Sequence, residues 1–389
     1  MPDATPSRRS FLRPFLTVVG VWSVLWGLPT ILLLYRIVPG GLPTAIGAWM
    51  VVVCAPLVGL LRAFGGAGAP SARTRVWIFR PFWYLQLLMP VVAIGGVIGA
   101  LVGWPLGSAG WAGRIGLAVT AGMLVLLVLL GYLGSRRLVV RTLPIAIAGL
   151  ADDLIGLRIA QVSDLHVGPH TRTAFLARVV ARIQESAPDL IVFTGDQVDD
   201  FVADVAPFAA AFGDLHAPLG LYAVAGNHDV YAGWSGVRAG LERMGIDVLV
   251  NEAVPIERGH ARLWLAGTGD PAGRSGGFRG ADAPAPDLDR TTAGIPAGEP
   301  VVALAHNPAL WPGLAQRGVH LTLSGHTHYG QLAFPKRYWS LAGVFLEHGH
   351  GLHRDGDRVL YINPGTNYWG IPFRLGTPAE VTVLILERA

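Results

Sequence analysis

The chain has 389 residues, enough for two domains, and its 52% hydrophobic content and mean hydropathy of +0.46 are high for a soluble protein. The net charge of +4 does not indicate nucleic-acid binding, because residues 1–150 hold twelve arginines and one acid whereas the rest of the chain is acidic. The single cysteine, Cys54, excludes an intrachain disulfide and a cysteine-based zinc site.

Four apolar stretches in the first 150 residues are each close to the ~20 residues that a helix needs to cross a bilayer. Trp and Tyr at several of their ends are typical of membrane interfaces, and glycine and proline are tolerated inside membrane helices. A hydrophobic soluble core is the alternative, and it is disfavoured because the four stretches lack any acidic residue. We predict an N-terminal α-helical membrane region, residues 1–145, with four spans. The stretches are Phe15–Tyr35, Leu42–Leu61, Phe82–Trp104 and Ile115–Leu133.

The arginines of this region are unevenly distributed between its loops. Ten lie before the first stretch, between the second and third, or after the fourth, and only Arg36 and Arg114 lie in the other two loops. The positive-inside rule therefore predicts an inner or plasma membrane protein with its C-terminal half in the cytoplasm. The segment Ser7–Arg13 also resembles a twin-arginine export signal, which would carry a folded domain outward. Because three more spans follow, we interpret the arginine pair as a topology anchor.

From residue 154 onward, short apolar strands alternate with amphipathic helices, which predicts a second, α/β domain over residues 154–389. The segment Gly269–Pro300 is rich in Gly and Pro, so we expect a mobile insertion around one short helix at Asp287–Ala293. The expected strands are Leu157–Val162, Leu190–Thr194, Leu221–Ala225, Asp247–Val250, Arg262–Ala266, Val301–Ala305, His320–Ser324, Val359–Asn363 and Val381–Leu386. The expected helices are Thr173–Ser186, Phe201–Leu215 and Trp234–Met244.

Five of these strands end in a small residue followed by Asp, Asn or His. Asp196 comes after Gly195 at the end of Leu190–Thr194, where open α/β sheets place their ligands. A capping aspartate would explain one such end, but five ends together gather oxygen and imidazole groups at one edge of a sheet. Such ligands without thiolate suit Mn, Fe or Zn, and a shared Asp196 could bridge two ions roughly 3.5–4 Å apart. The strand-end residues are Asp164, His166, Asp196, Asn227, His228, His306, His326 and His328.

These residues fall into five motifs, in the order in which they occur in the calcineurin-like metallophosphoesterase superfamily, and the sequence from Leu154 to Glu387 resembles that superfamily. Its ending, with Gly370–Arg374, is similar to the bacterial membrane-associated branch. The resemblance implies a layered β-sandwich flanked by helices. Tyr329 stands where close relatives often have glycine, and we expect it to narrow the mouth of the site. The motifs are Asp164-Leu-His166, Gly195-Asp196-x-x-Asp199, Gly226-Asn227-His228-Asp229, His306 and Gly325-His326-Thr-His328.

The resemblance also implies a role for each residue. His228 would donate a proton to the leaving group, and Asp229 would either orient His228 or cap the next helix. A hydroxide bridging two metal ions would attack the phosphorus of a phosphate mono- or diester. The implied ligands are Asp164, His166, Asp196 and His328 for the first metal, and Asp196, Asn227, His306 and His326 for the second.

The implied partners are a phosphate-ester substrate and the membrane bilayer, and no nucleic acid is expected. The spans and the aromatic residues near the last motifs favour the hypothesis of a lipid phosphate or lipid-linked pyrophosphate, although aromatic residues also pack cores. The alternative function is a membrane-tethered module that binds or senses a phosphorylated ligand with little turnover. Arg172, Arg274, Arg279 and Lys336 could hold a phosphate, although ordinary surface charge is the simpler interpretation. The aromatic residues are Tyr329, Phe334, Tyr338, Trp339, Tyr368 and Trp369.

Overall fold

A computed structural model of the chain describes residues 8–64, 70–275 and 285–389. Arg279, much of the loop predicted at Gly65–Arg75 and part of the insertion predicted at Gly269–Pro300 lie outside the described residues. The chain divides into two compact units, Met1–Leu130 and Gly131–Ala389, and each is described by itself.

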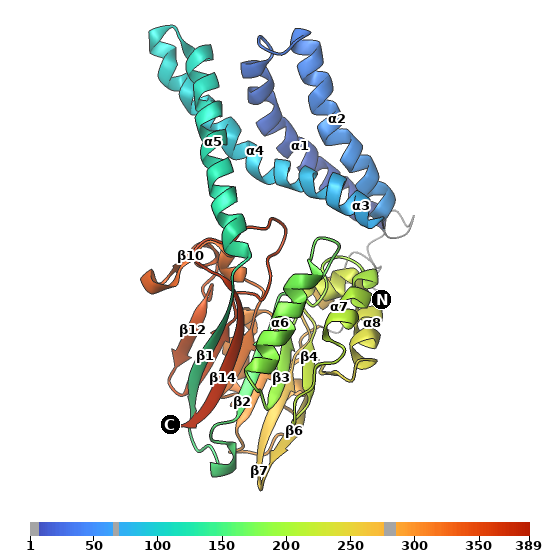
Figure 1. Cartoon of the computed structure of the whole chain (residues 1–389), viewed down its shortest axis with the longest axis vertical. Helices are drawn as coiled ribbons and strands as arrows, with labels where there is room; N and C mark the ends of the chain where they lie inside the picture. Colours follow the sequence, from blue (N-terminus) through green and yellow to red (C-terminus); the bar gives the residue numbers. More distant parts are fainter. Residues whose placement is uncertain (1–7, 65–69, 276–284) are drawn as a thin grey trace, which may run out of the picture. The chain divides into compact units, whose positions relative to one another are not determined.

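The first unit is built from apolar helices (Figure 1). Within the described residues, four helical segments are long and apolar enough to cross a membrane, which confirms the four predicted apolar helices. The third of these segments is continuous from Ala72 to Leu106 and includes a short π-helical stretch, η1. The helices are α1 (Arg8–Leu34), α2 (Gly41–Phe64), α3 (Ala72–Thr74), η1 (Arg75–Phe79), α4 (Arg80–Gly103), η2 (Trp104–Leu106) and α5 (Ala109–Ser135), the last of which continues into the second unit.

Glycines let α4 and α5 approach each other closely within this unit. A Cβ added to Gly99 of α4 would lie 2.4 Å from the carbonyl oxygen of Ala112, and one added to Gly116 of α5 would lie 2.2 Å from that of Gly95. Membrane helices commonly use small residues at such crossings. The sequence places these glycines where two apolar helices can pack backbone to backbone.

The second unit contains two six-stranded sheets that face each other (Figure 1). The first has the order β1-β14-β2-β3-β4-β5, and the second has the order β12-β13-β9-β8-β7-β6. The first sheet consists of β1 (Leu138–Ile147), β14 (Ala379–Arg388), β2 (Arg158–Val162), β3 (Leu190–Thr194), β4 (Leu221–Val224) and β5 (Asp247–Val248). The second consists of β12 (Gly351–Asp355), β13 (Arg358–Ile362), β9 (Leu321–Ser324), β8 (Val301–Leu304), β7 (Ala261–Gly267) and β6 (Glu252–Arg258). Two further strands, β10 (Ala333–Phe334) and β11 (Trp339–Ser340), pair with each other.

Apolar side chains fill three layers of this unit. Residues such as Ile159, Val192 and Leu265 form the core between the sheets. The outer face of the first sheet packs against α6 (Thr173–Glu185), α7 (Val205–Phe212) and α8 (Asn227–Glu242), with Phe193 and Phe208 in ring contact. The outer face of the second sheet packs against α9 (Leu288–Thr292) and α10 (Trp311–Gln316). This arrangement confirms the predicted layered β-sandwich flanked by helices. Seven short 3₁₀ turns complete the described part of this unit: η3 (Asp152–Leu154), η4 (Val202–Asp204), η5 (Pro271–Ser275), η6 (Pro308–Leu310), η7 (His328–Gln331), η8 (Pro335–Arg337) and η9 (Ala342–Val344).

Two features of the fold differ from the sequence-based expectation. Five strands, β1, β6, β10, β11 and β12, were not expected, and β1 pairs in parallel with β14 over ten residues. The helix expected at Trp234–Met244 begins earlier, at Asn227, because α8 continues across a kink at Gly233. The start of α8 matters for the site, because it places Asn227 and His228 in the first turn of a helix.

Candidate metal centre

Five segments bring their polar residues to one edge of the two sheets. Asp164 and His166 follow β2, Asp196 follows β3, and Asn227 and His228 follow β4 at the start of α8. His306 follows β8 in the second sheet, and His326 and His328 follow β9. The strand-end residues therefore converge as predicted, and they form two clusters with Asp196 between them.

The first cluster joins His166, His328 and Asp164. The Nε2 atoms of the two histidines lie 3.0 Å apart, and Asp164 Oδ1 lies 3.3 Å from His328 Nε2. All three side chains are buried. Imidazole nitrogens and a carboxylate oxygen that face one another at this spacing match the ligands of a first-row transition metal.

The second cluster joins His306, Asn227 and His326. Asn227 Oδ1 lies 3.3 Å from His306 Nε2 and 2.8 Å from His326 Nδ1. The Nδ1–H of His306 donates to the carbonyl oxygen of Thr194 at 2.8 Å, which directs the Nε2 lone pair toward the cluster.

Asp196 lies between the two clusters. A single oxygen, Oδ2, is 3.5 Å from His166 Nε2 and 3.3 Å from His306 Nε2. The other oxygen, Oδ1, accepts a hydrogen bond from the backbone N–H of His228 at 2.8 Å. One carboxylate oxygen therefore faces a histidine of each cluster, which is the position that a bridging ligand requires.

The electrostatics favour an ionised Asp196 and neutral imidazoles at three of the four ligand histidines. His306 differs, because burial opposes its charge but the Asp196 carboxylate raises its pKa well above the ordinary value. Burial lowers the pKa of His166 and of His328 well below the ordinary value, and burial together with His306 lowers the pKa of His326 to about 4. Burial opposes charge on Asp196, but His306 and His228 hold the pKa of Asp196 well below its usual range. Metal binding needs neutral imidazole and ionised carboxylate, so Asp196 and the three histidines of lowered pKa meet this requirement, whereas a cation in the second cluster would displace the proton of His306.

Backbone strain is concentrated in the same residues. Asp164, His166, Asp196, His326 and His328 have φ between 42° and 69°, in the left-handed region. Such conformations cost roughly 1–3 kcal/mol each and persist where the surrounding structure imposes them, commonly at functional sites. Five strained ligand candidates in one place are independent support for a functional centre.

Glycines give the clusters the space they need. Gly195 has a φ of 94°, and a Cβ there would lie 2.4 Å from His306 Nδ1. A Cβ on Gly226 would lie 2.2 Å from Asp196 Oδ1, and one on Gly325 would lie 2.2 Å from Asp164 Oδ2. The small residue before each polar strand end is therefore required by close packing.

His228 lies beside the first cluster. Its ring contacts that of His166 edge to face, with centroids 4.7 Å apart, and it also contacts the Trp369 ring, with centroids 5.6 Å apart. His228 Nδ1 lies 2.8 Å from the carbonyl oxygen of Asp199, so its Nδ1–H can donate there. This leaves Nε2 as the atom that can exchange a proton with a bound molecule.

Asp229 contacts the backbone around the bridge. Its Oδ2 accepts hydrogen bonds from the N–H groups of Asp196 and Gly226, each at 2.8 Å, and its Oδ1 accepts from that of Val198 at 3.2 Å. These contacts match the helix-capping alternative and fix the loop that carries Asp196. Burial, together with the Asp196 carboxylate, raises the pKa of Asp229 to about 7.

Three further residues complete the surroundings of the clusters. The Asp199 carboxylate lies between two imidazoles, with Oδ1 3.7 Å from His166 Nδ1 and Oδ2 3.7 Å from His170 Nδ1. The sequence motif names Asp199, but nothing in it indicates His170. Arg374 is 1% exposed, and its Nη2 lies 3.4 Å from His328 Nδ1. Arg374 is 46 residues away in the sequence, and no local pattern places it there.

The expectation that Tyr329 narrows the mouth of the site is wrong. Its side chain is 2% exposed, and its hydroxyl donates to the carbonyl oxygen of Ile362 at 2.7 Å. The backbone at Tyr329 has a φ of 56°, which turns the ring into an apolar cluster with Trp311 and Leu360.

Of the arginines and lysine considered for phosphate binding, Arg279 lies outside the described residues.

Comparison with known proteins agrees with this geometry. The family described as calcineurin-like phosphoesterase matches residues 157–330. The chain is 35% identical over 255 residues to a transmembrane protein with a metallophosphoesterase domain from Danio rerio, covering 63% of this chain and 56% of that protein. It is 30% identical over 268 residues to a metallophosphoesterase of Helicobacter pylori, covering 67% of this chain and 68% of that protein. It is also 30% identical over 249 residues to phosphodiesterase YaeI of Escherichia coli, covering 62% of this chain and 86% of that protein.

The fold and the site are those of a family of metal-dependent phosphoester hydrolases, and the described residues also include four helices that are long and apolar enough to cross a membrane. The chain belongs to the calcineurin-like phosphoesterase family. The matched region spans little more than half the length of the Danio rerio relative.

Proposed function

We propose that this protein hydrolyses phosphate mono- or diesters at a dinuclear metal centre in residues 154–389, held at the membrane by its spans. The observation that carries the proposal is the position of Asp196 Oδ2, within 3.5 Å of His166 Nε2 and 3.3 Å of His306 Nε2. The residues that would hold the first metal are Asp164, His166, Asp196 and His328, and those that would hold the second are Asp196, Asn227, His306 and His326.

The metals and the protein would divide the chemistry between them. Two bound cations supply a water molecule of lowered pKa as the nucleophile and neutralise charge on the phosphoryl oxygens. The donor set contains nitrogen and oxygen without sulfur, which suits Mn, Fe or Zn. His228 would protonate the leaving oxygen from Nε2, while its Nδ1–H donates a hydrogen bond to the carbonyl oxygen of Asp199. Asp229 would keep Asp196 and the first turn of α8 in place through its three backbone hydrogen bonds.

The substrate class we propose is a lipid phosphate or lipid-linked pyrophosphate. The four spans keep the site at a bilayer. Several aromatic side chains of the second unit are exposed, among them Phe334 (48%), Tyr338 (90%) and Trp369 (50%), and Trp369 contacts His228. An exposed aromatic ring beside the proposed catalytic histidine, as at Trp369, suits a substrate with an apolar portion.

The test uses the purified full chain in detergent with aryl phosphate mono- and diesters and with lipid phosphates. Chelation should abolish turnover, and addition of Mn, Fe or Zn should restore it. His228→Ala should lower the rate by about 10²–10⁴-fold while the bound metal is retained, because it removes a general acid. The matched control is His216→Ala, an exposed histidine outside the site.

Turnover that persists without metal would overturn the proposal. A protein that binds two metals and a phosphorylated ligand but hydrolyses no ester would instead be a binding or sensing module. Rapid cleavage of cyclic nucleotides with no cleavage of lipid phosphates would overturn the lipid assignment alone.

A further inference from the structure

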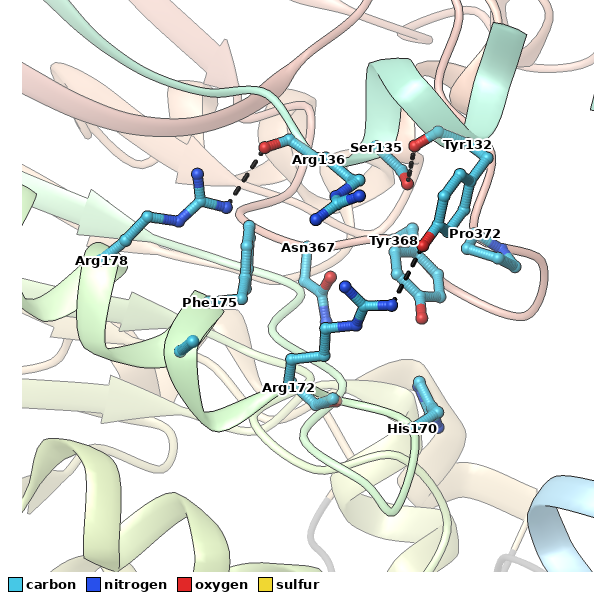
Figure 2. A pocket seen from close by; sticks show the side chains of 12 residues that line it. Tyr132, Ser135, Arg136, His170, Arg172, Phe175, Arg178, Asn367, Tyr368 and Pro372 are labelled. Carbon is cyan, nitrogen blue, oxygen red and sulfur yellow. Dashed lines mark hydrogen bonds between the residues drawn. The ribbon is translucent and has the colours of Figure 1, made fainter. Parts of the chain in front are cut away.

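A pocket of about 310 Å³ lies in the second unit, where α5 ends and α6 begins (Figure 2). Three arginines line it: Arg136 after α5, Arg172 before α6, and Arg178 within α6. Tyr132 and Tyr368 are also among the lining residues. Neither the family motifs nor the predicted metal ligands account for this pocket.

The pocket carries positive charge that its surroundings leave uncompensated. Among the described residues that line it none is acidic, and among the ion pairs between described residues none involves Arg136, Arg172 or Arg178. Figure 2 shows the guanidinium groups of Arg136 and Arg172 both directed toward the middle of the labelled side chains. Like charges gathered in one place repel, so an anion between them would be stabilised. Arginine forks match the oxygens of a phosphate group.

Neutral contacts hold these arginines in place. Arg172 Nη2 donates to the hydroxyl of Tyr132 at 3.0 Å, and Arg178 Nη2 donates to the carbonyl oxygen of Arg136 at 3.2 Å (Figure 2). Both contacts leave further N–H donors on each guanidinium, which has five. The pocket is therefore arranged in advance and still has donors for a ligand.

Chain connectivity places the pocket at the level of lipid headgroups. Tyr132 and Ser135 belong to the last turns of the candidate span Ala109–Ser135, and Arg136 is the next residue. Tyrosine and arginine at the end of a span are typical of the interface between the hydrocarbon core and water. Clustered basic residues next to a span attract anionic lipids.

The pocket and the metal clusters share one segment of the chain. Thr171 Oγ1 in the pocket wall donates to the carbonyl oxygen of His166 at 3.1 Å. His170, also in the wall, has Nδ1 3.7 Å from Asp199 Oδ2. A ligand in the pocket would thus contact the loop that carries a predicted metal ligand, while remaining outside the clusters.

We propose that this pocket binds the phosphate group of an anionic membrane lipid, with Arg136 and Arg172 as its main contacts and Arg178 as a third. The binding does not depend on turnover at the metal centre. A soluble phosphate ester offers the same anion, so the experiment must separate the two sources.

The experiment measures binding of dioctanoyl phosphatidic acid to the purified full chain in uncharged detergent, in a His228→Ala background that slows any hydrolysis. Arg136→Gln/Arg172→Gln should weaken binding at least tenfold, whereas dioctanoyl phosphatidylcholine should bind weakly to both proteins. Arg136→Lys/Arg172→Lys should recover part of the affinity, because charge remains but the fork geometry is lost. The matched control is Arg182→Gln/Arg243→Gln, which removes the same charge from exposed positions outside the pocket.

Glycerol 3-phosphate provides the soluble arm and should bind more weakly than the lipid. Equal affinity for the two ligands would overturn the assignment to a membrane lipid. An equal loss of affinity for the lipid in the pocket variant and in the control variant would overturn the assignment of the binding site to this pocket. If the protein hydrolyses no phosphate ester but the pocket variant still loses the lipid, the proposed activity fails and this inference stands.

Discussion

Asp196 connects the two clusters, so its replacement should affect both metals. Asp196→Asn keeps the shape but removes the charge that would neutralise two cations. We expect the metal content to fall from two ions per chain to fewer than one, and turnover to fall at least 100-fold, since the site would lose its bridge. Elemental analysis of the purified protein measures the first effect and ester hydrolysis the second.

Asp214→Asn is the control, because Asp214 is exposed and lies outside the clusters. A variant at Asp196 that keeps two tightly bound metals would contradict the bridging role. His328→Ala, which would remove a ligand from the first metal only, should retain about one ion.

Arg374 lies beside the predicted ligand His328, with Nη2 3.4 Å from His328 Nδ1. It is buried, and its guanidinium donates to the carbonyl oxygens of Pro364, Gly365, Asn367 and Thr377. Arg374→Met would leave these carbonyls unpaired, at a cost of about 1–3 kcal/mol for each one that water cannot reach. We expect a clear drop in the thermal unfolding midpoint of the detergent-solubilised protein.

The exposed Arg354 on β12 supplies the comparison, since Arg354→Met should change the midpoint little. Equal midpoints for the two variants would show that the buried guanidinium does not stabilise the fold.

At the scale of single residues, the sequence predicts the site residues that directly follow strands and misses those that reach the site from other segments. Asp164, Asp196 and His306 were recognisable because each follows an apolar strand. Arg374 and His170 were not, because their positions depend on packing between segments far apart in the sequence. The direction of Tyr329 was predicted wrongly because it depends on a positive φ that a sequence pattern does not reveal.

At the scale of elements, β14 holds the first sheet together. It lies between β1, with which it is parallel, and β2, with which it is antiparallel. Leu384 of β14 is fully buried between the sheets. Leu384→Ala should lower the free energy of unfolding by about 2–5 kcal/mol, because it leaves a cavity in a close-packed core.

Leu352→Ala on β12 is the matched control, because Leu352 is 43% exposed. This substitution should change the free energy of unfolding by no more than about 0.5 kcal/mol. Denaturant titration of both variants followed by tryptophan fluorescence makes the comparison, and equal losses would contradict the assigned core.

The strand β1 shows why some elements escape prediction. It is an edge strand, and it contains Arg141 and Pro144 beside the end of a membrane helix. Within sheets, proline is tolerated mainly at edge strands, so its presence disfavours a central strand and weakens the local pattern of an edge strand such as β1. The ten-residue pairing with β14 supplies stability that the local sequence does not indicate. The four apolar helices were predictable, because their length and composition follow from the thickness of the bilayer alone.

At the scale of the whole molecule, the arginine distribution predicts the side of the membrane that the second unit faces. We expect it in the cytoplasm. In a Cys54→Ser background, Asp214→Cys should react with a membrane-impermeant maleimide only after the cells are lysed. Labelling of intact spheroplasts would contradict this topology and favour export through the twin-arginine-like segment.

The position of β14 has a consequence for synthesis on the ribosome. β1 is translated directly after α5, but its partner β14 follows roughly 230 residues later. At 5–20 residues per second, the nascent chain waits on the order of tens of seconds with an unpaired edge. Open strand edges pair readily with other chains, so we expect the half-made second unit to be prone to aggregation until β14 has been synthesised.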